Sequence, residues 1–183
     1  MEAENSSKIG DFSHKFTIFT DGSALNNKEN ASAGWAIYIP RLKKLMSKHM
    51  IGTNNQAELE AIRYALWWVN IHISSDKSNK DSDDGEDDFD LKRLINGELF
   101  IFTDSEYSMN SITGKWKKLK GNLPKINICR KLISDLQENG ISTQFIHVKA
   151  HTKKTDFISL NNDIVDSEAR RQANNNDKPD KCT

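Results

Sequence analysis

The sequence has little cysteine, no long hydrophobic run and no net charge. Two cysteines in 183 residues argue against a disulfide scaffold, and neither Cys129 nor Cys182 has a His or Cys partner at metal-ligand spacing. No apolar run approaches the roughly 20 residues that cross a bilayer, and residues 1–10 lack the apolar core of a signal peptide. We therefore expect an intracellular protein that is neither secreted nor bound to a membrane; a nuclear, cytoplasmic or viral origin stays open.

The absence of net charge hides a strong asymmetry along the chain. The 26 basic and 26 acidic residues cancel overall, but the stretch from Asp76 to Asp90 carries eight acids against two bases. The stretch from Lys115 to Lys131 carries seven bases and no acid. The first stretch is rich in serine and predicts a disordered acidic insertion at about 74–88. Local charge attracts phosphates, so the second predicts contact with a polyanion, although charge runs are also typical of solvated faces.

The length fits one domain at about 15–174, with a disordered N-terminus at 1–14 and a flexible tail at 175–183. Alternating apolar residues predict five strands, at about 15–21, 33–40, 44–52, 98–103 and 141–148. Helical spacing predicts four helices. The first follows the capping residues 53–55 and ends near residue 73, and the others lie at about 105–112, 124–139 and 162–174. Short connections indicate an antiparallel meander of the first three strands, and a right-handed crossover places the fourth beside the first. The expected fold is α/β, a mixed five-stranded sheet flanked by helices.

Two of the expected strands lead into the same Thr-Asp dipeptide. The stretch Phe16-Thr-Ile-Phe-Thr-Asp-Gly-Ser23 has a near copy in Leu99-Phe-Ile-Phe-Thr-Asp-Ser105. If these strands are neighbours, Asp21 and Asp104 lie side by side at one edge of the sheet. Two bare carboxylates at that distance repel one another, so the pair requires a cation between them. Taken alone, each has a simpler explanation, Asp21 as a turn residue and Asp104 as a helix cap.

Two further carboxylates fall where they can join this pair. Glu58 is expected in the first turn of its helix, where the helix dipole alone favours a negative charge. Asp166 lies on the last helix, on one face with Ala169 and Ala173. A face of small residues can pack closely on the sheet and direct Asp166 to its edge. Because burying an unpaired charge is costly, a purely structural role explains Asp166 less well.

Five short motifs follow one another along the chain. They are Phe-Thr-Asp21-Gly-Ser, Thr-Asn-Asn-Gln-Ala-Glu58-Leu, Thr-Asp104-Ser-Glu-Tyr, Val-Lys-Ala-His151 and Asn162-Asp-Ile-Val-Asp166-Ser-Glu-Ala-Arg. Each motif is weak alone, but in this order and spacing they make the sequence resemble the type 1 ribonuclease H family. The resemblance covers about residues 15–174. It implies an endonuclease that hydrolyses the RNA strand of RNA–DNA hybrids and leaves 5′-phosphate and 3′-hydroxyl ends.

The resemblance also implies a role for each of five catalytic residues. By the family's pattern Asp21 bridges two divalent ions, with Glu58 and Asp104 on one side and Asp166 on the other. His151 would sit on a loop and assist proton transfer or product release. Oxygen ligands suit Mg²⁺, for which Mn²⁺ can substitute, and two such ions about 4 Å apart activate a water and stabilise the leaving oxygen. We expect a monomer that needs no small-molecule cofactor.

Further matches imply contacts with the hybrid. Residues 54–56 correspond to a stretch that reaches into the minor groove, and residues 22–23 to backbone near the 2′-hydroxyls that mark the RNA strand. The basic segment around Trp116 is expected to hold phosphates of the DNA strand. The expected substrate-binding set is Gly22, Ser23, Asn54, Asn55, Gln56, Lys115, Trp116, Lys117, Lys118 and Asn162.

Departures from the family's pattern leave other functions open. Glu106 stands where many members carry a neutral side chain, the basic segment is short, and the stretch from His151 to Asn162 is longer than in compact bacterial members. One alternative is a catalytically weak nucleic-acid-binding module of the same fold, which binding without cleavage in Mg²⁺ would indicate. Another is a DNA nuclease or strand-transfer enzyme, which cleavage of an all-DNA duplex would indicate.

Overall fold

The computed structural model describes residues 12–26, 28–75, 91–117, 121–149 and 155–175. The strands in these ranges are β1 (Phe16–Ala24), β2 (Ser32–Ile39), β3 (Lys44–Ile51), β4 (Glu98–Thr103) and β5 (Ser142–His147). The helices are α1 (Asn54–Ser75), α2 (Leu91–Ile95), α3 (Glu106–Ile112), α4 (Leu123–Glu138) and α5 (Phe157–Ala173), with a 3-10 helix η1 at Pro40–Leu42. Every predicted strand and helix is present, and η1 and α2 are additions.

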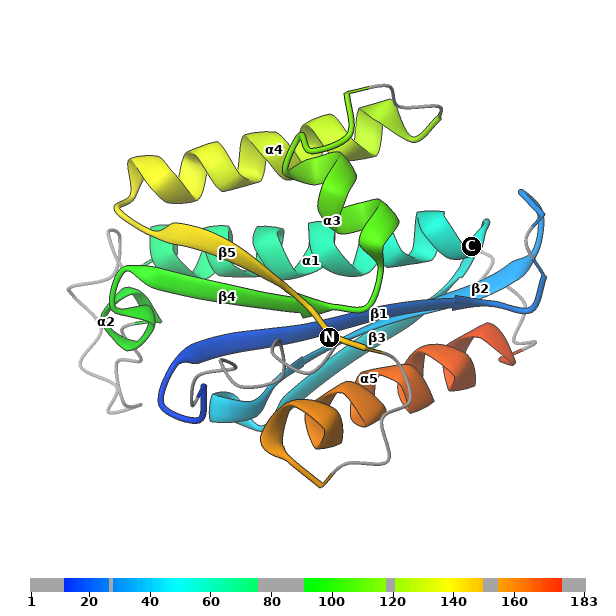
Figure 1. Ribbon diagram of the computed structural model, residues 1–183, viewed down its shortest axis with the longest axis horizontal. Helices are drawn as coiled ribbons and strands as arrows, with labels where there is room; N and C mark the ends of the chain where they lie inside the picture. Colours follow the sequence, from blue (N-terminus) through cyan, green and yellow to red (C-terminus); the bar gives the residue numbers. More distant parts are fainter. Residues whose placement is uncertain (1–11, 27, 76–90, 118–120, 150–154, 176–183) are drawn as a thin grey trace, which may run out of the picture.

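The five strands form one mixed sheet in the order β3-β2-β1-β4-β5. Strand β2 pairs antiparallel with β1 and with β3, whereas β4 is parallel to both β1 and β5. Figure 1 shows α1, α3 and α4 over one face of the sheet and α5 over the other. The predicted α/β fold is therefore confirmed, including the crossover that places β4 beside β1.

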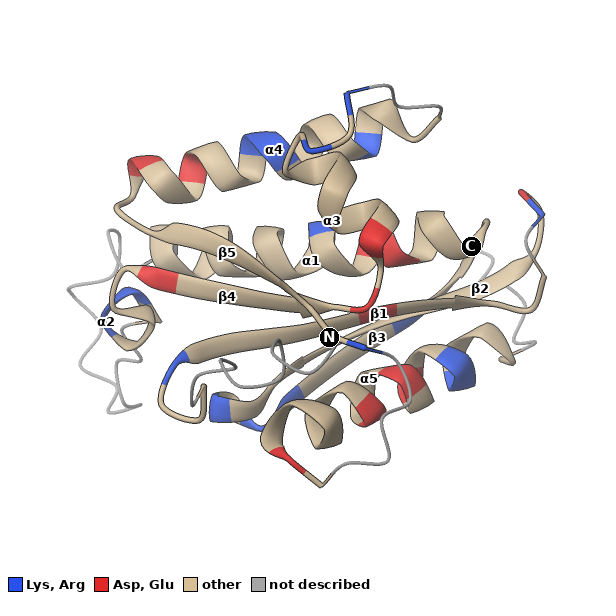
Figure 2. Ribbon diagram, viewed as in Figure 1, with Lys and Arg blue, Asp and Glu red and all other residues tan. Residues whose placement is uncertain are grey.

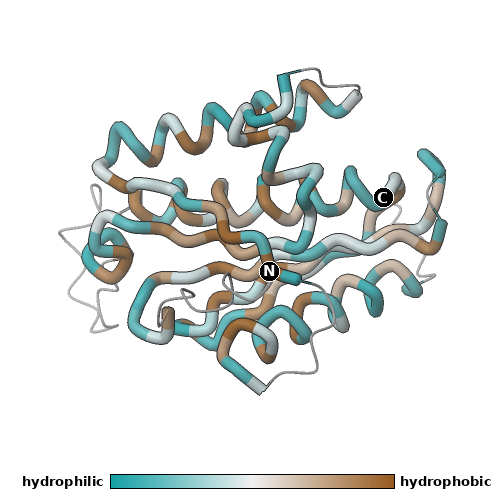
Figure 3. Tube along the Cα trace, in the orientation of Figure 1, coloured by the Kyte–Doolittle hydropathy of each residue, from teal (hydrophilic) through white to brown (hydrophobic). Residues whose placement is uncertain are grey.

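Alternation along β1 divides the core into two layers. Phe16 and Ile18 are buried in the larger layer with α1 and α4, while Phe19 lies in the smaller layer with residues of α5. Figure 3 shows hydrophobic colour along the central strands between the helices. Burying such a side chain stabilises the fold by about 1.5–3 kcal/mol. The register of β1 is fixed as a result, because a slip by one residue would exchange the two layers.

Helix α1 begins with a capping box and carries the predicted apolar stripe. The N–H of Gln56 donates to Thr53 Oγ1 at 3.3 Å, and the N–H of Thr53 donates to Gln56 Oε1 at 2.9 Å, which satisfies two otherwise unpaired donors. The stripe residues are all buried: Leu59, Ile62, Leu66, Val69 and Ile73. Asn54 and Asn55, expected as caps, are the first helical residues. The helix includes Ser74 and Ser75, which we expected in the disordered insertion at about 74–88, and residues 76–88 lie outside the described ranges.

Two helices differ from the prediction for local reasons. Helix α5 starts at Phe157 rather than at residue 162, because the carboxylate of Asp156 caps it by accepting from the N–H of Ser159 at 3.0 Å. Helix α2 was not expected. Leu91 and Ile95, one helical turn apart, are both buried, and the adjacent acidic run concealed this short pattern.

The N-terminal stretch 1–14, which we expected to be disordered, is ordered at its end. Phe12 packs edge-to-face on Phe100 and Phe102, with ring centroids 5.1 Å apart in both pairs. It extends the smaller core layer beside α5. Residues 1–11 and 176–183, which include most of the expected tail, lie outside the described ranges.

Candidate active site

Asp21 lies inside β1, at the level where β4 ends. The parallel pairing of these strands reaches Phe102, whose carbonyl accepts a hydrogen bond from Thr20 Oγ1 at 3.2 Å. We expected β1 to end at Asp21, but it continues to Ala24 because its antiparallel pairing with β2 continues. Asp104 follows the last residue of β4. The two aspartates therefore meet at one edge of the β1–β4 pair, as the strand order predicted.

Helix α1 brings Glu58 to the same place, and Gly22 permits the close approach. Glu58 is the fifth residue of α1, just beyond the first turn in which we expected it, so the helix dipole explains its position less well. A Cβ atom at position 22 would overlap the backbone of Ala57 and Glu58. Any residue larger than glycine after Asp21 would push α1, and Glu58 with it, away from β1.

The three carboxylates form one cluster. Asp21, Glu58 and Asp104 each offer an oxygen, and these oxygens lie within 4.8 Å of one another. Asp21 and Glu58 are each only 4 % exposed, whereas Asp104 is half-buried. Figure 2 shows acidic positions gathered where β1 and the start of α3 come together. Three acids in so little space repel each other strongly unless a proton or a cation neutralises them.

Burial and, after it, mutual repulsion raise the pKa of two of these acids. Burial, followed by the charges of Asp104 and Asp166, raises the pKa of Asp21 from 3.8 to about 8. Burial likewise raises the pKa of Glu58 well above its usual value, and the charges of Asp21 and Asp104 add to the effect. In the absence of a cation, the buried acids therefore hold protons at pH values where a surface carboxylate is ionised.

The donor set fits a divalent metal ion. Glu58 Oε2 is buried and has no hydrogen-bond partner among the described residues. An unsatisfied buried acceptor costs roughly 1–3 kcal/mol, which a coordinated cation would offset. Clustered carboxylate oxygens are ligands that suit Mg²⁺ and Mn²⁺ better than softer metal ions. The cluster can thus hold a hard divalent ion and place it next to whatever binds at this edge of the sheet.

Two polar contacts that position the cluster were not found from the sequence. His147 Nε2 donates to the backbone carbonyl of Asp104 at 3.0 Å, which ties the end of β5 to the residue after β4. Thr103 Oγ1 accepts from the N–H of Ser105 at 3.2 Å. The threonine that precedes each aspartate in the sequence could have indicated such contacts, since Thr20 and Thr103 both form hydrogen bonds beside the cluster. His147 gave no such signal, because its partner is distant in the sequence.

The RNase H family model matches residues 13–80 and 90–174, which is most of the chain. The chain belongs to the RNase H family. The carboxylate cluster, the strand order and the motif order noted in the sequence are consistent with this membership. Among curated proteins, none is similar enough to the chain to count as a match.

Solved structures of RNase H proteins share the fold at low sequence identity. RNase H1 from the archaeon Halobacterium salinarum NRC-1 is 19 % identical, with a TM-score of 0.51, and the match covers 86 % of this chain and 96 % of that one. LC11-RNase H1, isolated from compost and solved in complex with RNA/DNA hybrid, is 21 % identical, with a TM-score of 0.55 and coverages of 86 % and 95 %. The N-terminal RNase H domain of rv2228c from Mycobacterium tuberculosis is 18 % identical, with a TM-score of 0.54 and coverages of 86 % and 97 %.

In this member of the RNase H family, Asp166 lies near the cluster but is not one of the three residues whose oxygens converge. It sits on α5 with its side chain 21 % exposed, and Arg170 Nε pairs with its Oδ1 at 2.9 Å. Its charge is close enough to raise the pKa of Asp21. The fourth carboxylate therefore approaches the cluster from α5, on the face of the sheet opposite to α1, and pairs with a base one helical turn away.

The residues expected to contact a hybrid differ in their exposure. Asn54 is exposed, Asn55 and Gln56 are half-buried, and the Gln56 side chain serves the α1 cap. Lys115, Trp116 and Lys117 are exposed after α3. Gly22 is buried against α1 and Ser23 is half-buried on β1.

The indole of Trp116 is not simply solvated. It lies edge-on to Tyr107, with centroids 6.0 Å apart, and the Tyr107 hydroxyl accepts from Asn122 Nδ2 at 3.1 Å.

Asn162 is buried on α5, and its Oδ1 has no hydrogen-bond partner in the described part of the chain. His151 and Lys118 lie outside the described ranges. No helix in those ranges is both long and apolar enough to cross a bilayer.

Proposed function

We propose that this chain hydrolyses the RNA strand of RNA–DNA hybrids in a reaction that depends on divalent metal ions, leaving 5′-phosphate and 3′-hydroxyl ends. The observation that carries the proposal is the convergence of three carboxylate oxygens within 4.8 Å on an RNase H fold. LC11-RNase H1, at 21 % identity, was solved with an RNA/DNA hybrid, which supports the substrate class.

The proposed roles of the chain's residues are to bind the metal ions and to keep the metal-binding side chains in position. Asp21, Glu58, Asp104 and Asp166 would hold two Mg²⁺ ions, for which Mn²⁺ can substitute; the orphan Oε2 of Glu58 supports this donor set. Such ions, when bound, activate a water and stabilise the oxygen that leaves the phosphate. Gly22 keeps α1 close enough for Glu58 to reach Asp21. His151 is proposed to assist proton transfer or product release.

The hybrid would lie across the cluster with its DNA strand on the basic segment. Residues 22–23 and 54–56 are proposed to sense the RNA strand, together with Asn162, whose buried Oδ1 is unsatisfied in the described ranges. Lys115, Trp116, Lys117 and Lys118 are proposed to contact phosphates and sugars of the DNA strand. The exposure of Lys115, Trp116 and Lys117 supports this placement, and lysine–phosphate contacts would make binding sensitive to salt.

The experiment that tests this function uses one labelled RNA strand, annealed in turn to DNA and to RNA, with Mg²⁺, Mn²⁺ or EDTA. We expect metal-dependent cleavage of the hybrid and none of the RNA duplex. Asp21→Asn should abolish cleavage while hybrid binding stays the same or becomes tighter, since one charge that repels phosphate is removed. Asp163→Asn, at an exposed position of α5, is the matched control and should cleave normally.

Two outcomes would replace the proposal. Hybrid binding without cleavage in either metal would indicate a catalytically weak binding module, with the exposed Glu106 at the start of α3 as the first residue to substitute. Cleavage of an all-DNA duplex would indicate a DNA nuclease of the same fold. Full activity of Asp21→Asn would remove the site assignment itself.

A further inference from the structure

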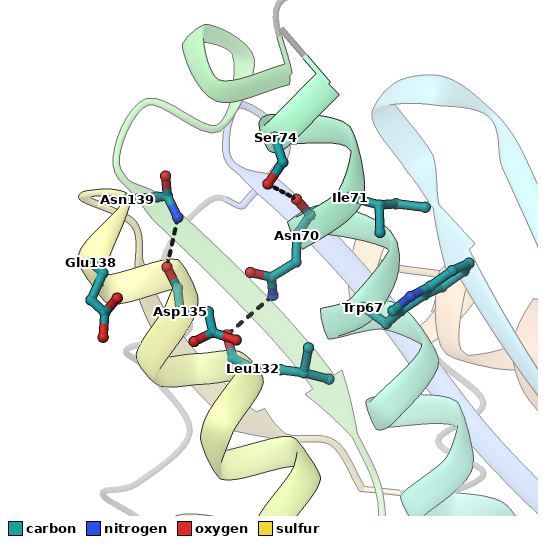
Figure 4. Close-up of a pocket in the computed structure, with 8 residues that line it drawn as sticks. All are labelled: Trp67, Asn70, Ile71, Ser74, Leu132, Asp135, Glu138 and Asn139. Carbon is teal, nitrogen blue, oxygen red and sulfur yellow. Dashed lines mark hydrogen bonds between the residues drawn. The ribbon is translucent and has the colours of Figure 1, made fainter. Parts of the chain in front are cut away.

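A groove of about 720 Å³ lies between the C-terminal halves of α1 and α4. Figure 4 shows its lining residues as sticks, with Trp67 and Ile71 on α1 and Leu132 on α4. Asp135 and Glu138 of α4 also line it. The carboxylate cluster lies at the opposite end of α1, so this groove belongs to a different surface of the molecule.

The apolar lining of the groove is exposed and held in place. Trp67 is 38 % exposed and Ile71 is 36 % exposed. The ring of Trp67 lies 5.2 Å from that of Tyr64, which in turn lies 4.5 Å from that of the buried Trp35. This row of rings fixes the indole without covering it. An aromatic face held in this way can bind an apolar or cationic side chain without first losing conformational freedom.

The C-termini of α1 and α4 lie at the same end of the groove. Lys125 Nζ pairs with Glu60 Oε2 at 2.6 Å, and farther along both helices Asn70 Nδ2 donates to the carbonyl of Leu132 at 3.1 Å. Helices α1 and α4 therefore run in the same direction, and the negative ends of their dipoles lie together. A lysine or arginine commonly neutralises such an end, but the last turn of α4 has no base and that of α1 has only His72.

Acidic side chains add to this negative potential. Lys131 Nζ pairs with Asp135 Oδ1 at 2.8 Å, and the charge of the same lysine also attracts Glu138, so two acids share one base. Figure 2 shows red at the end of α4 that adjoins β5. A nucleic acid or another phosphate-bearing ligand would be repelled here.

We infer that this groove is a docking site for a basic segment of a partner protein. An aliphatic or aromatic side chain of the segment would sit against Trp67, Ile71 and Leu132, and a lysine or arginine would lie beside Glu138 and the two helix ends. The groove is small by the standard of stable protein interfaces, so we expect a dissociation constant of about 10–100 µM. Binding should weaken with salt, because charge attraction contributes to it.

The test titrates the isotope-labelled chain with a short synthetic amphipathic peptide that has leucines on one face and lysines on the other. We expect saturable NMR shifts of the Trp67 indole, Ile71 and Leu132. A matched peptide with glutamates in place of the lysines should cause none. Glu138→Lys and, independently, Trp67→Ser should each weaken binding about tenfold, which corresponds to about 1.4 kcal/mol.

Matched controls separate this site from general attraction to acids. Glu29→Lys and Leu160→Ser change an exposed acid and an exposed leucine elsewhere and should leave peptide affinity unchanged. Shifts confined to the residues around Asp21, or equal affinity for wild type and Glu138→Lys, would overturn the inference. A concentration-dependent dimer that Trp67→Ser abolishes would also overturn it, since the occupant would then be a second copy. None of these readouts depends on nuclease activity.

Discussion

Acidic side chains lie beside both ends of helix α1, and their charge is accommodated differently at the two ends. At its start, Glu58 is 4 % exposed and meets Asp21 and Asp104 with oxygens within 4.8 Å. At its end, Asp135 and Glu138 border a groove that is open to water. Burial raises the pKa of Asp21 and Glu58, whereas the acids beside the groove stay in contact with water.

This comparison indicates that burial, rather than the number of acids, makes their charge costly and favours binding of a metal ion. The acids at the start of α1 are buried away from water and repel one another. Only protons or a cation can neutralise them there. The acids beside the end of α1 stay hydrated, and one of them, Asp135, pairs with Lys131. One end therefore suits a tightly held inorganic ion, and the other suits a loosely held basic partner.

The largest effect should come from removing one buried acid and comparing it with an exposed one. We expect Glu58→Gln to lower the cleavage rate by about 10²-fold or more, since charge stabilisation in a dry site is lost. Glu138→Gln, the matched change at the other end, should leave the rate unchanged. Single-turnover cleavage of a labelled hybrid measures both. Equal cleavage rates for the two variants would contradict the proposed difference between the buried and the exposed acid.

Gly22→Ala should have the next largest effect, through position rather than charge. The new methyl group would overlap the backbone of Ala57 and Glu58, and a displacement of about 1 Å can cost about 10²-fold in rate. Gly97→Ala is the control, because it strains a backbone with φ of 81° without a contact closer than 3.7 Å. We expect both variants to unfold at lower temperature, but only Gly22→Ala to lose cleavage.

The stability of the metal-free chain should fall as the pH rises. The folded state raises the pKa of Asp21 from 3.8 to about 8, so it favours the protonated acid. The stabilising effect of that proton is complete below the unfolded pKa and is lost as the pH rises through the folded value. Thermal unfolding in EDTA should therefore give a lower Tm at about pH 8 than at about pH 5. Asp21→Asn should flatten this dependence, and added Mg²⁺ should restore the Tm.

The sequence alone was sufficient for features that repeat along the chain. Alternation in 16–21 and 99–103 predicted two buried strands, and chain order predicted that they are neighbours, which together located Asp21 and Asp104. The stripe from Leu59 to Ile73 predicted α1. These features depend on periodicity and on the handedness of crossovers, and both are written locally in the sequence.

Other features depend on contacts that local patterns do not encode. The bond from His147 to the carbonyl of Asp104 needs the register between β4 and β5, in which His147 lies opposite Thr103. The role of Gly22 depends on how closely α1 crosses β1. The groove beside Trp67 needs the parallel packing of α1 and α4. The early start of α5, by contrast, is indicated in the sequence by the capping residue Asp156, and the predicted start at residue 162 was wrong.

The smallest predicted effect concerns the exposed end of α1. Lys131→Ala removes the partner of Asp135 from an exposed ion pair, and we expect the Tm to change by no more than about 1 °C, since such pairs contribute little to stability. The same change should tighten binding of the basic peptide about twofold, because the groove becomes more negative. Calorimetric unfolding and the NMR titration measure the two effects. A large loss of stability would mean that the acids at this end also require neutralisation, and the contrast between the two ends of α1 would then be one of degree.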